Sequence, residues 1–240
     1  MKLLRTFFLL VASAVVVHPS LAQDSVAADT TGVPFLWERP LPCVVTSGLL
    51  LAGSSTLFFD PSISVNNFVR DNVQTWRQEQ FGNSGTTIDN YLQFVPYAAV
   101  EGLSLLGVPS RHSGWPLLFR TGSSLAMVTL TTHTLKHIIG EKRPDSGARN
   151  SFPSGHTSFA FGGAELLRLE YGETSPLIPV AGYTVAVTTG FMRIYNDRHW
   201  LGDVFAGAAI GLLCADFAYW LNDKLEPLLA PKKKTPPLIQ

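Results

Sequence analysis

The sequence predicts an all-α fold, a membrane helical bundle of five to six apolar helices. Two observations carry this prediction. The chain of 240 residues is 46% hydrophobic and only 15% charged, which is little charge for a soluble domain. Long apolar runs alternate with short polar breaks, and two of these runs approach the roughly 20 residues that cross a bilayer.

The first element is typical of an export signal. Lys2 and Arg5 precede an apolar stretch at 6–17, and small residues then suit cleavage near Ala22. An uncleaved first membrane helix is the alternative, because the stretch is barely longer than a typical signal core. We therefore expect a signal peptide at residues 1–22.

Residues 23–60 are predicted as an N-terminal segment with a short apolar helix at 43–59. This helix is rich in Ser, Thr and Gly, so we expect it to lie along the bundle or to re-enter the membrane. The helical bundle itself is predicted at 61–223. It begins with a helix on the membrane surface, because apolar residues recur there at helical spacing among polar ones: Val65, Val69, Val73 and Trp76.

Five apolar runs follow the surface helix, at 94–108, 117–135, 157–168, 176–192 and 200–221. The last two hold almost no charge and are predicted to be membrane helices, with a buried helix pair in a soluble protein as the alternative. Tryptophans stand at the edges of runs, where an indole belt would meet a membrane surface: Trp115, Trp200 and Trp220. A basic, Pro-rich C-terminal tail is predicted at 224–240.

Charge and cysteine content limit the partners. The formal net charge is zero with His neutral, so the chain lacks the basic field that grips nucleic acid, and no nucleic-acid partner is expected. Cys43 and Cys214 are too few for a disulfide scaffold, and we interpret both as small core hydrophobes. The sequence does not determine an oligomeric state.

Three polar clusters at the ends of the apolar runs carry the candidate chemistry. They are Lys136 with Arg143 and Pro144, the segment Pro153-Ser154-Gly155-His156, and Arg193 with His199 and Asp203. The Lys and two Arg supply permanent cations, and the forked donors of Arg match phosphate oxygens. We expect Ser154 to cap the helix that begins near His156, and Gly155 to let the backbone approach an anion at that helix N-terminus. Together the clusters predict one anion site.

His199 and Asp203 are spaced four residues apart, so on a helix that begins after Asp197 they would share one face. Asp203 would then accept a hydrogen bond from one ring nitrogen and leave the other nitrogen free to attack. A metal site is the alternative reading of this pair. The cluster is crowded with cations and lacks further N, O or S ligands, so we expect no metal and no cofactor.

The three clusters resemble the tripartite signature of the type 2 phosphatidic acid phosphatase superfamily, in its bacterial membrane lipid phosphatase branch. The signature covers residues 136–203, and the order of runs from about residue 90 to 221 is also similar, whereas residues 1–60 show no likeness. One departure is Met192, where the family usually has a small residue, often Ser. This change removes a hydroxyl beside Arg193.

The resemblance implies a helical bundle with the active site at one membrane face and a metal-independent, two-step phosphatase. His199 would attack phosphorus, Asp203 would orient it, and His156 would protonate the leaving oxygen. The implied phosphate-binding residues are Lys136, Arg143, Ser154, Gly155 and Arg193. His199 must then be neutral and His156 charged, with local cations lowering the pKa of the first and the bound dianion raising that of the second.

The implied substrate is a lipid phosphate or pyrophosphate: phosphatidate, phosphatidylglycerol phosphate, undecaprenyl pyrophosphate or a phosphate of lipid A. The implied location is the bacterial inner membrane, with a multi-pass chain and the active site facing the periplasm. A soluble periplasmic acid phosphatase is the alternative within the family, and a vanadate-binding haloperoxidase shares the anion cage. An alternative from another class is a membrane transporter or lipid-headgroup binder. The sequence contains both a candidate general acid and a separate candidate nucleophile. A protein that only binds headgroups requires neither, which argues against this alternative.

Overall fold

The computed structural model describes residue 48 and residues 64–229, and within these residues it contains helices and no strands. The helices are α3 (Ser64–Phe81), α4 (Asp89–Leu92), α5 (Val95–Leu105), α6 (Trp115–Ile139), α7 (Gly155–Tyr171), α8 (Leu177–Tyr195) and α9 (Leu201–Leu229). The predicted signal peptide, the helix at 43–59 apart from Gly48, and residues 230–240 of the predicted tail lie outside the described residues. The all-α class is confirmed for the described part of the chain.

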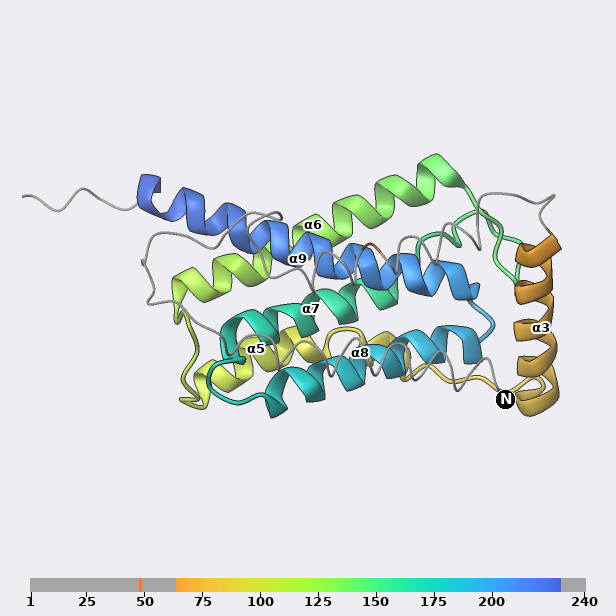
Figure 1. The fold of residues 1–240 in the computed structure, drawn as a ribbon, viewed down its shortest axis with the longest axis horizontal. Helices are drawn as coiled ribbons and strands as arrows, with labels where there is room; N and C mark the ends of the chain where they lie inside the picture. The colour runs from red at the N-terminus through yellow and green to blue at the C-terminus, as the bar shows by residue number, and fades with distance from the viewer. Residues whose placement is uncertain (1–47, 49–63, 230–240) are drawn as a thin grey trace, which may run out of the picture.

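Each of the five apolar runs coincides with one of the helices α5 to α9, which lie along the long axis of the bundle (Figure 1). Two stretches among the described helices are long and apolar enough to cross a membrane, Leu177–Tyr195 and Leu201–Glu226. The expectation of five to six apolar membrane helices is therefore not confirmed by length and composition. The other helices are shorter or carry more polar side chains, as the Thr and His residues near the end of α6 illustrate.

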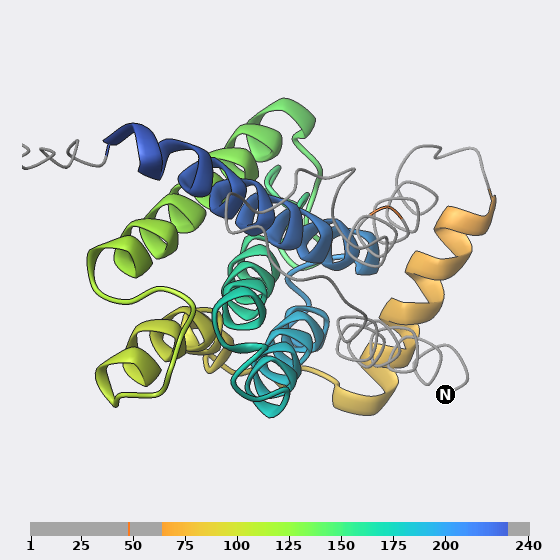
Figure 2. The same cartoon turned by 60° about the vertical axis from the view of Figure 1, so that its left-hand side comes forward.

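Helix α7 is the centre of the bundle, and α5, α6, α8 and α9 all pack against it. Figure 2 shows α7 between these four helices. Most residues of α7 are buried, including Ala160, Gly162 and Ala164. Small side chains let neighbouring helix backbones approach closely. The small residues of α7 therefore allow the four neighbouring helices to bury most of it.

One close contact between α7 and α9 brings two of the polar clusters together. A Cβ added to Gly207 on α9 would lie 2.5 Å from the carbonyl oxygen of Ser154 and 3.1 Å from Cβ of Thr157. Only glycine fits at that distance. The backbone N–H of Ser154 also donates to the carbonyl oxygen of Asp203 at 3.0 Å, so the start of α7 is fixed against the start of α9.

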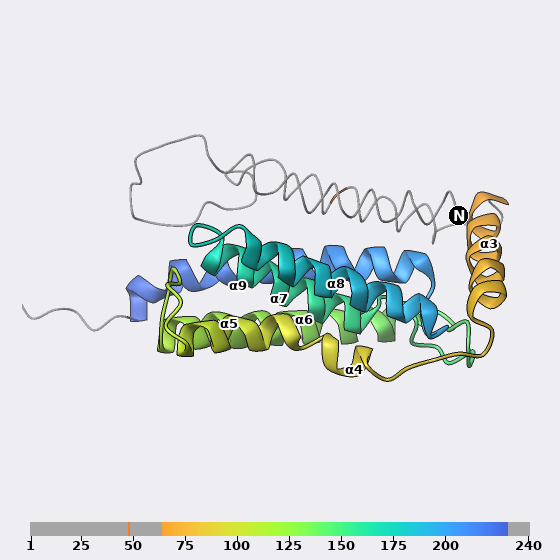
Figure 3. The same cartoon turned by 90° about the horizontal axis from the view of Figure 1, so that it is seen from below.

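Helix α3 lies across one end of the bundle (Figures 1 and 3). Nε of Arg77 donates to the carbonyl oxygen of Tyr195 at 3.0 Å, and the ring of Phe81 meets that of Tyr195 with centroids 4.9 Å apart. Arg70 pairs with Glu141 and lies 4.8 Å over the ring of Trp200. The predicted helix is confirmed here; its place on a membrane surface stays a prediction.

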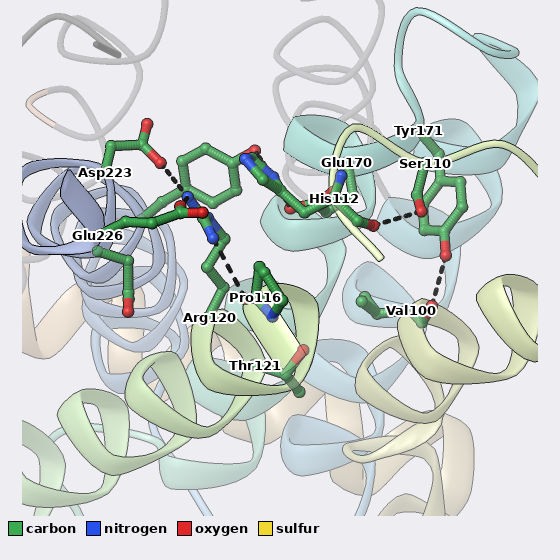
Figure 4. A network of polar contacts seen from close by, with 12 residues as sticks. Val100, Ser110, His112, Pro116, Arg120, Thr121, Glu170, Tyr171, Asp223 and Glu226 are labelled. Atoms are coloured by element: carbon green, nitrogen blue, oxygen red, sulfur yellow. Dashed lines mark hydrogen bonds and ion pairs between the residues drawn. The ribbon is translucent and has the colours of Figure 1, made fainter. Parts of the chain in front are cut away.

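The opposite end of the bundle holds a network of charged side chains (Figure 4). Nη2 of Arg120 on α6 donates to Asp223 at 2.5 Å and to Glu226 at 2.8 Å, both on α9. Nδ1 of His112 lies 2.9 Å from Oε1 of Glu170 at the end of α7. These contacts join three helices and the loop before α6.

Candidate active site

All three sequence clusters lie at the end of the bundle where α6 ends, α7 begins and α8 passes into α9. Helix α6 ends at Ile139, and its C-cap Gly140 has φ of 61° and adopts the left-handed conformation that favours glycine. The chain then turns through residues 141–154 and brings the second cluster back beside Lys136. The structure thus gathers residues that are up to 67 positions apart in the sequence, from 136 to 203.

Lys136 fixes the loop between α6 and α7. Its Nζ donates to the carbonyl oxygens of Asn150, Ser151 and Pro153, at 2.7, 3.1 and 2.6 Å. Its charge is therefore balanced by carbonyl dipoles and not by a carboxylate in direct contact. Arg143 is held in a similar way, because its Nε donates to Oδ1 of Asn150 at 2.7 Å. Two of the predicted phosphate-binding cations are thus held by neutral groups.

Ser154 occupies the N-cap of α7, as predicted, but its side chain does not cap the helix. Its hydroxyl is fully buried and lies 2.8 Å from the hydroxyl of Thr157. The prediction of a side-chain cap is wrong, because a nearer hydroxyl takes the hydrogen bond. A Cβ added to Gly155 would meet Thr132 at 3.5 Å, which is ordinary contact. The protein's own packing therefore does not require glycine at position 155.

His199 and Asp203 meet, although not on one helical face. Helix α9 begins at Leu201, so His199 lies in the turn before it. Nδ1 of His199 is 3.4 Å from Oδ2 of Asp203, and both side chains are buried. The prediction that a helix carries both residues is wrong: α9 begins only at Leu201, and the carboxylate of Asp203 accepts from the backbone N–H of Trp200 just before that start. The imidazole faces the carboxylate as expected, but among the described residues Nδ1 lacks the expected hydrogen bond at this distance; Nε2 is the ring nitrogen on the far side.

The carboxylate of Asp203 is oriented by two donors that sequence reasoning missed. The hydroxyl of Ser151 donates to Oδ2 at 2.5 Å, and the backbone N–H of Trp200 donates to the same oxygen at 2.9 Å. Ser151 is fully buried. It stands two residues before the second cluster, but nothing in its type or spacing distinguished it from other loop serines.

Two contacts from α4 were also missed. Asp89 is buried and pairs with Nη1 of Arg193, and Oδ1 of Asn90 lies 2.9 Å from Nε2 of His156. Figure 3 shows α4 beside the bundle, on the chain between α3 and α5. Helix α4 begins at residue 89, which is 47 positions before the first cluster begins at residue 136. No sequence motif distinguished its four residues.

The two imidazoles are both held in the neutral form. Burial lowers the pKa of His199 to about 4, although Asp203 acts in the opposite direction. Burial also lowers the pKa of His156 to about 3, and the charge of Arg193 adds to the effect. The charged form of His156 was expected only with a phosphate dianion bound, so it stays a prediction; in the protein without an anion, desolvation outweighs the nearby carboxylate of Asp89. A bound phosphate dianion would act in the opposite direction.

One group of side chains among the described residues has the composition of a metal site. The candidate ligand atoms of His112, Asp223 and Glu226 lie within 4.8 Å of one another. They are at the end of the bundle opposite the three clusters (Figure 4). The guanidinium of Arg120 already contacts both carboxylates, so this group binds a cationic side chain.

The family model described as the PAP2 superfamily matches residues 117–227, a range that contains the three clusters. The resemblance inferred from the clusters is confirmed. A lipid A 1-phosphatase of Porphyromonas gingivalis is 39% identical over 202 residues, which cover 84% of this chain and 44% of that protein. Lipid phosphate phosphatase 2 of Arabidopsis thaliana is 30% identical over 148 residues, which cover 45% of this chain and 50% of that protein.

The chain thus spans about half the length of these curated relatives. Among solved structures, a transmembrane PAP2-type phosphatidylglycerolphosphate phosphatase from Bacillus subtilis has a TM-score of 0.53 at 16% identity. The match covers 80% of this chain and 98% of that one. It shows that the two proteins share a fold.

Proposed function

Because the PAP2 superfamily model matches residues 117–227, a range that contains the three clusters, we propose that the chain is a membrane-bound phosphatase of this superfamily that hydrolyses a lipid phosphate or pyrophosphate through a phosphohistidine intermediate. The observation that carries this proposal is the buried pair of His199 and Asp203 among the cations of the other clusters. A binding protein would need the cations. It would not need a neutral imidazole with one nitrogen facing a carboxylate.

The proposed reaction has two steps. Nε2 of His199 attacks phosphorus, the bond from phosphorus to the lipid oxygen breaks, and His156 gives a proton to that oxygen. Water then attacks the phosphohistidine, and the bond from phosphorus to nitrogen breaks with release of inorganic phosphate. Lys136, Arg143 and Arg193 balance the charge on the phosphate oxygens, which is the task that metal ions perform in two-metal phosphatases. We therefore propose that no metal takes part.

A phosphate of lipid A is the first substrate to test among the four implied lipids. The support is the relative named lipid A 1-phosphatase, which aligns with 84% of this chain. The other three lipids, phosphatidate, phosphatidylglycerol phosphate and undecaprenyl pyrophosphate, form the rest of the panel.

The test is phosphate release from this panel by the full chain purified in detergent, with and without EDTA. We expect release from at least one lipid, no loss of rate in EDTA, and inhibition by vanadate. His199→Ala is the matched inactive control. Loss of activity in EDTA that magnesium or zinc restores would contradict the assignment of the site. Binding of the lipids without phosphate release would favour the headgroup-binding alternative, and release from membranes by carbonate would favour a soluble acid phosphatase.

We also propose that α5 to α9 cross the bacterial inner membrane and that the active site faces the periplasm. Large apolar side chains on α5 and α6 are exposed in the structure, including Leu105, Leu130 and Ile138. Large apolar side chains left exposed in this number are consistent with contact with lipid. Five crossings, with residues 43–59 not counted, put Lys232 to Lys234 on the cytoplasmic side, in agreement with the positive-inside rule.

Cysteine labelling tests this orientation. In a chain with Cys43 and Cys214 changed to Ser, an impermeant thiol reagent outside the inner membrane should label a Cys introduced at residue 147 and not one at residue 236. The reverse pattern would show that the active site faces the cytoplasm.

A further inference from the structure

Helix α4 lies outside the matched family range and outside all three clusters, but it contacts two of the candidate site residues. Asp89 pairs with Arg193, and Asn90 meets His156. The polar contacts of α4 are directed at the groups assigned to phosphate and to the leaving oxygen.

The backbone of α4 is anchored on both sides of Asn90. Asp89 is 1% exposed, and its carboxylate is fixed by the guanidinium of Arg193 on α8. Before α4, the backbone N–H of Thr86 donates to Oδ1 of Asn196 at 2.8 Å, just after α8 ends. After Asn90, Nε2 of Gln93 donates back to the carbonyl oxygen of Asn90 at 2.8 Å. These contacts fix the backbone at Asn90, whose exposed side chain then meets the ring of His156.

The contact between Asn90 and His156 determines which ring nitrogen carries the proton. The amide oxygen Oδ1 accepts, so at 2.9 Å the imidazole donates from Nε2. A general acid must present a proton to the oxygen that leaves. Because the Nε2–H bond is directed at Oδ1 of Asn90, the proton that the charged ring gives to the leaving oxygen must come from Nδ1, and the contact with Asn90 fixes the direction in which Nδ1 faces.

We propose that Asn90 is a positioning residue for the general acid: it accepts the hydrogen bond from Nε2 of His156 and so fixes the tautomer and the direction in which Nδ1 presents a proton to the leaving oxygen. This inference rests on the proposed phosphatase function and on the role of His156 within it. Asn90 acts through His156 and not on phosphorus, so its effect must depend on how much the leaving group needs a proton.

The kinetic test compares two substrates. Asn90→Ala should slow release from an alkyl lipid phosphate by up to about 10²-fold, because misplacing a catalytic group costs about that much. It should leave nitrophenyl phosphate within about threefold of the wild type, because a phenolate leaves without protonation. Asn83→Ala is the matched control: Asn83 is exposed in the loop before α4, and its loss should change neither rate. In a His156→Ala chain, Asn90→Ala should cost nothing more.

A second readout does not depend on activity. Asn90→Asp puts a carboxylate where the amide oxygen lies, 2.9 Å from Nε2, and should raise the pKa of His156 from about 3. The charged and titratable groups that already face this ring are Arg193, Asp89, His199 and Arg143. An NMR titration of the imidazoles in the full chain would detect the shift, with His156→Ala to assign the signal, and Asn90→Ala should show no rise.

Equal loss on both substrates in Asn90→Ala, an unchanged rate on both, or an unchanged His156 titration in Asn90→Asp would each overturn the proposal. If the wild-type chain releases phosphate from no substrate, the proposed function fails instead. The imidazole titration then still decides whether Asn90 controls His156.

Discussion

The two ends of the bundle are built from the same helices, α6, α7 and α9, but their charges are arranged differently. At the end with Arg120, the guanidinium contacts two carboxylates, and His112 contacts a third. At the opposite end, Lys136 donates to carbonyl oxygens and Arg143 to an amide oxygen, whereas Arg193 pairs with the carboxylate of Asp89. One end is thus an ion-pair network, and the other combines two cations that neutral groups hold with a third that a carboxylate holds.

The difference separates a structural task from a chemical one. Removing one partner of a buried ion pair leaves an uncompensated charge, so the network around Arg120 stabilises the position of α6 against α9. Cations that are held by neutral dipoles keep most of their attraction for an anion from solution. We infer that substitutions at the Arg120 end change stability, whereas substitutions at the His199 end change turnover.

The largest effect should come from His199→Ala. His199 is the nucleophile of the proposed reaction, so turnover should disappear for every substrate, including nitrophenyl phosphate. Rates and thermal unfolding should be measured on the same detergent-purified samples. A folded variant that still turns over the activated substrate would show that another group attacks phosphorus.

His156→Ala should be less severe and should depend on the leaving group. Loss of a general acid costs about 10²- to 10⁴-fold, and an alkyl lipid phosphate should show this loss in full. Nitrophenyl phosphate should be spared most of it, because its phenolate leaves readily. The ratio of the two losses is the measurement, and a ratio near one would remove His156 from the role of acid.

Arg120→Met tests the comparison at the other end of the bundle, where we expect a loss of stability and not of turnover. It leaves the carboxylate of Asp223 buried without its partner, and breaking a buried pair costs about 3–5 kcal/mol of stability. Unfolding in detergent should show this loss, while the rate per folded molecule stays near that of the wild type. The double variant Arg120→Met with Asp223→Leu should recover part of the stability. If Arg120→Met lowers the rate of folded protein as strongly as His156→Ala, the two ends are not separate in function.

The smallest change is a shift in pH dependence. His199 attacks only when neutral, and burial lowers its pKa to about 4, so the acid limb of kcat/KM should lie near pH 4 and not near 6.5. The neutral His156 of the free protein must gain its proton together with the substrate. Activity should therefore fall as pH rises through the second pKa of the phosphate, about 6. The limbs belong to coupled groups, and an acid limb above pH 6 would mean that His199 is not buried in this way.

Much of the helical arrangement could be predicted because it depends on local patterns. Apolar runs and polar breaks located α5 to α9, and helical spacing of Val69, Val73 and Trp76 located α3. The three clusters could be found because their residue types and spacing are distinctive. Two predictions about local hydrogen bonding and helix limits were wrong. The Ser154 hydroxyl forms its hydrogen bond with Thr157 and not with the helix amides, and α9 begins after His199.

The sequence by itself determined the helical class, the superfamily and the residues that can carry phosphoryl chemistry, because each depends on residue type and on spacing along the chain. Only the tertiary structure decided which side chains and backbone groups contact and orient those residues. Ser151 orients Asp203, and Asn90 meets His156, through contacts between residues 52 and 66 positions apart. The physical reason is that a single Ser or Asn has many equivalent places in a sequence. Its task is defined by the atom that packing brings within hydrogen-bond distance.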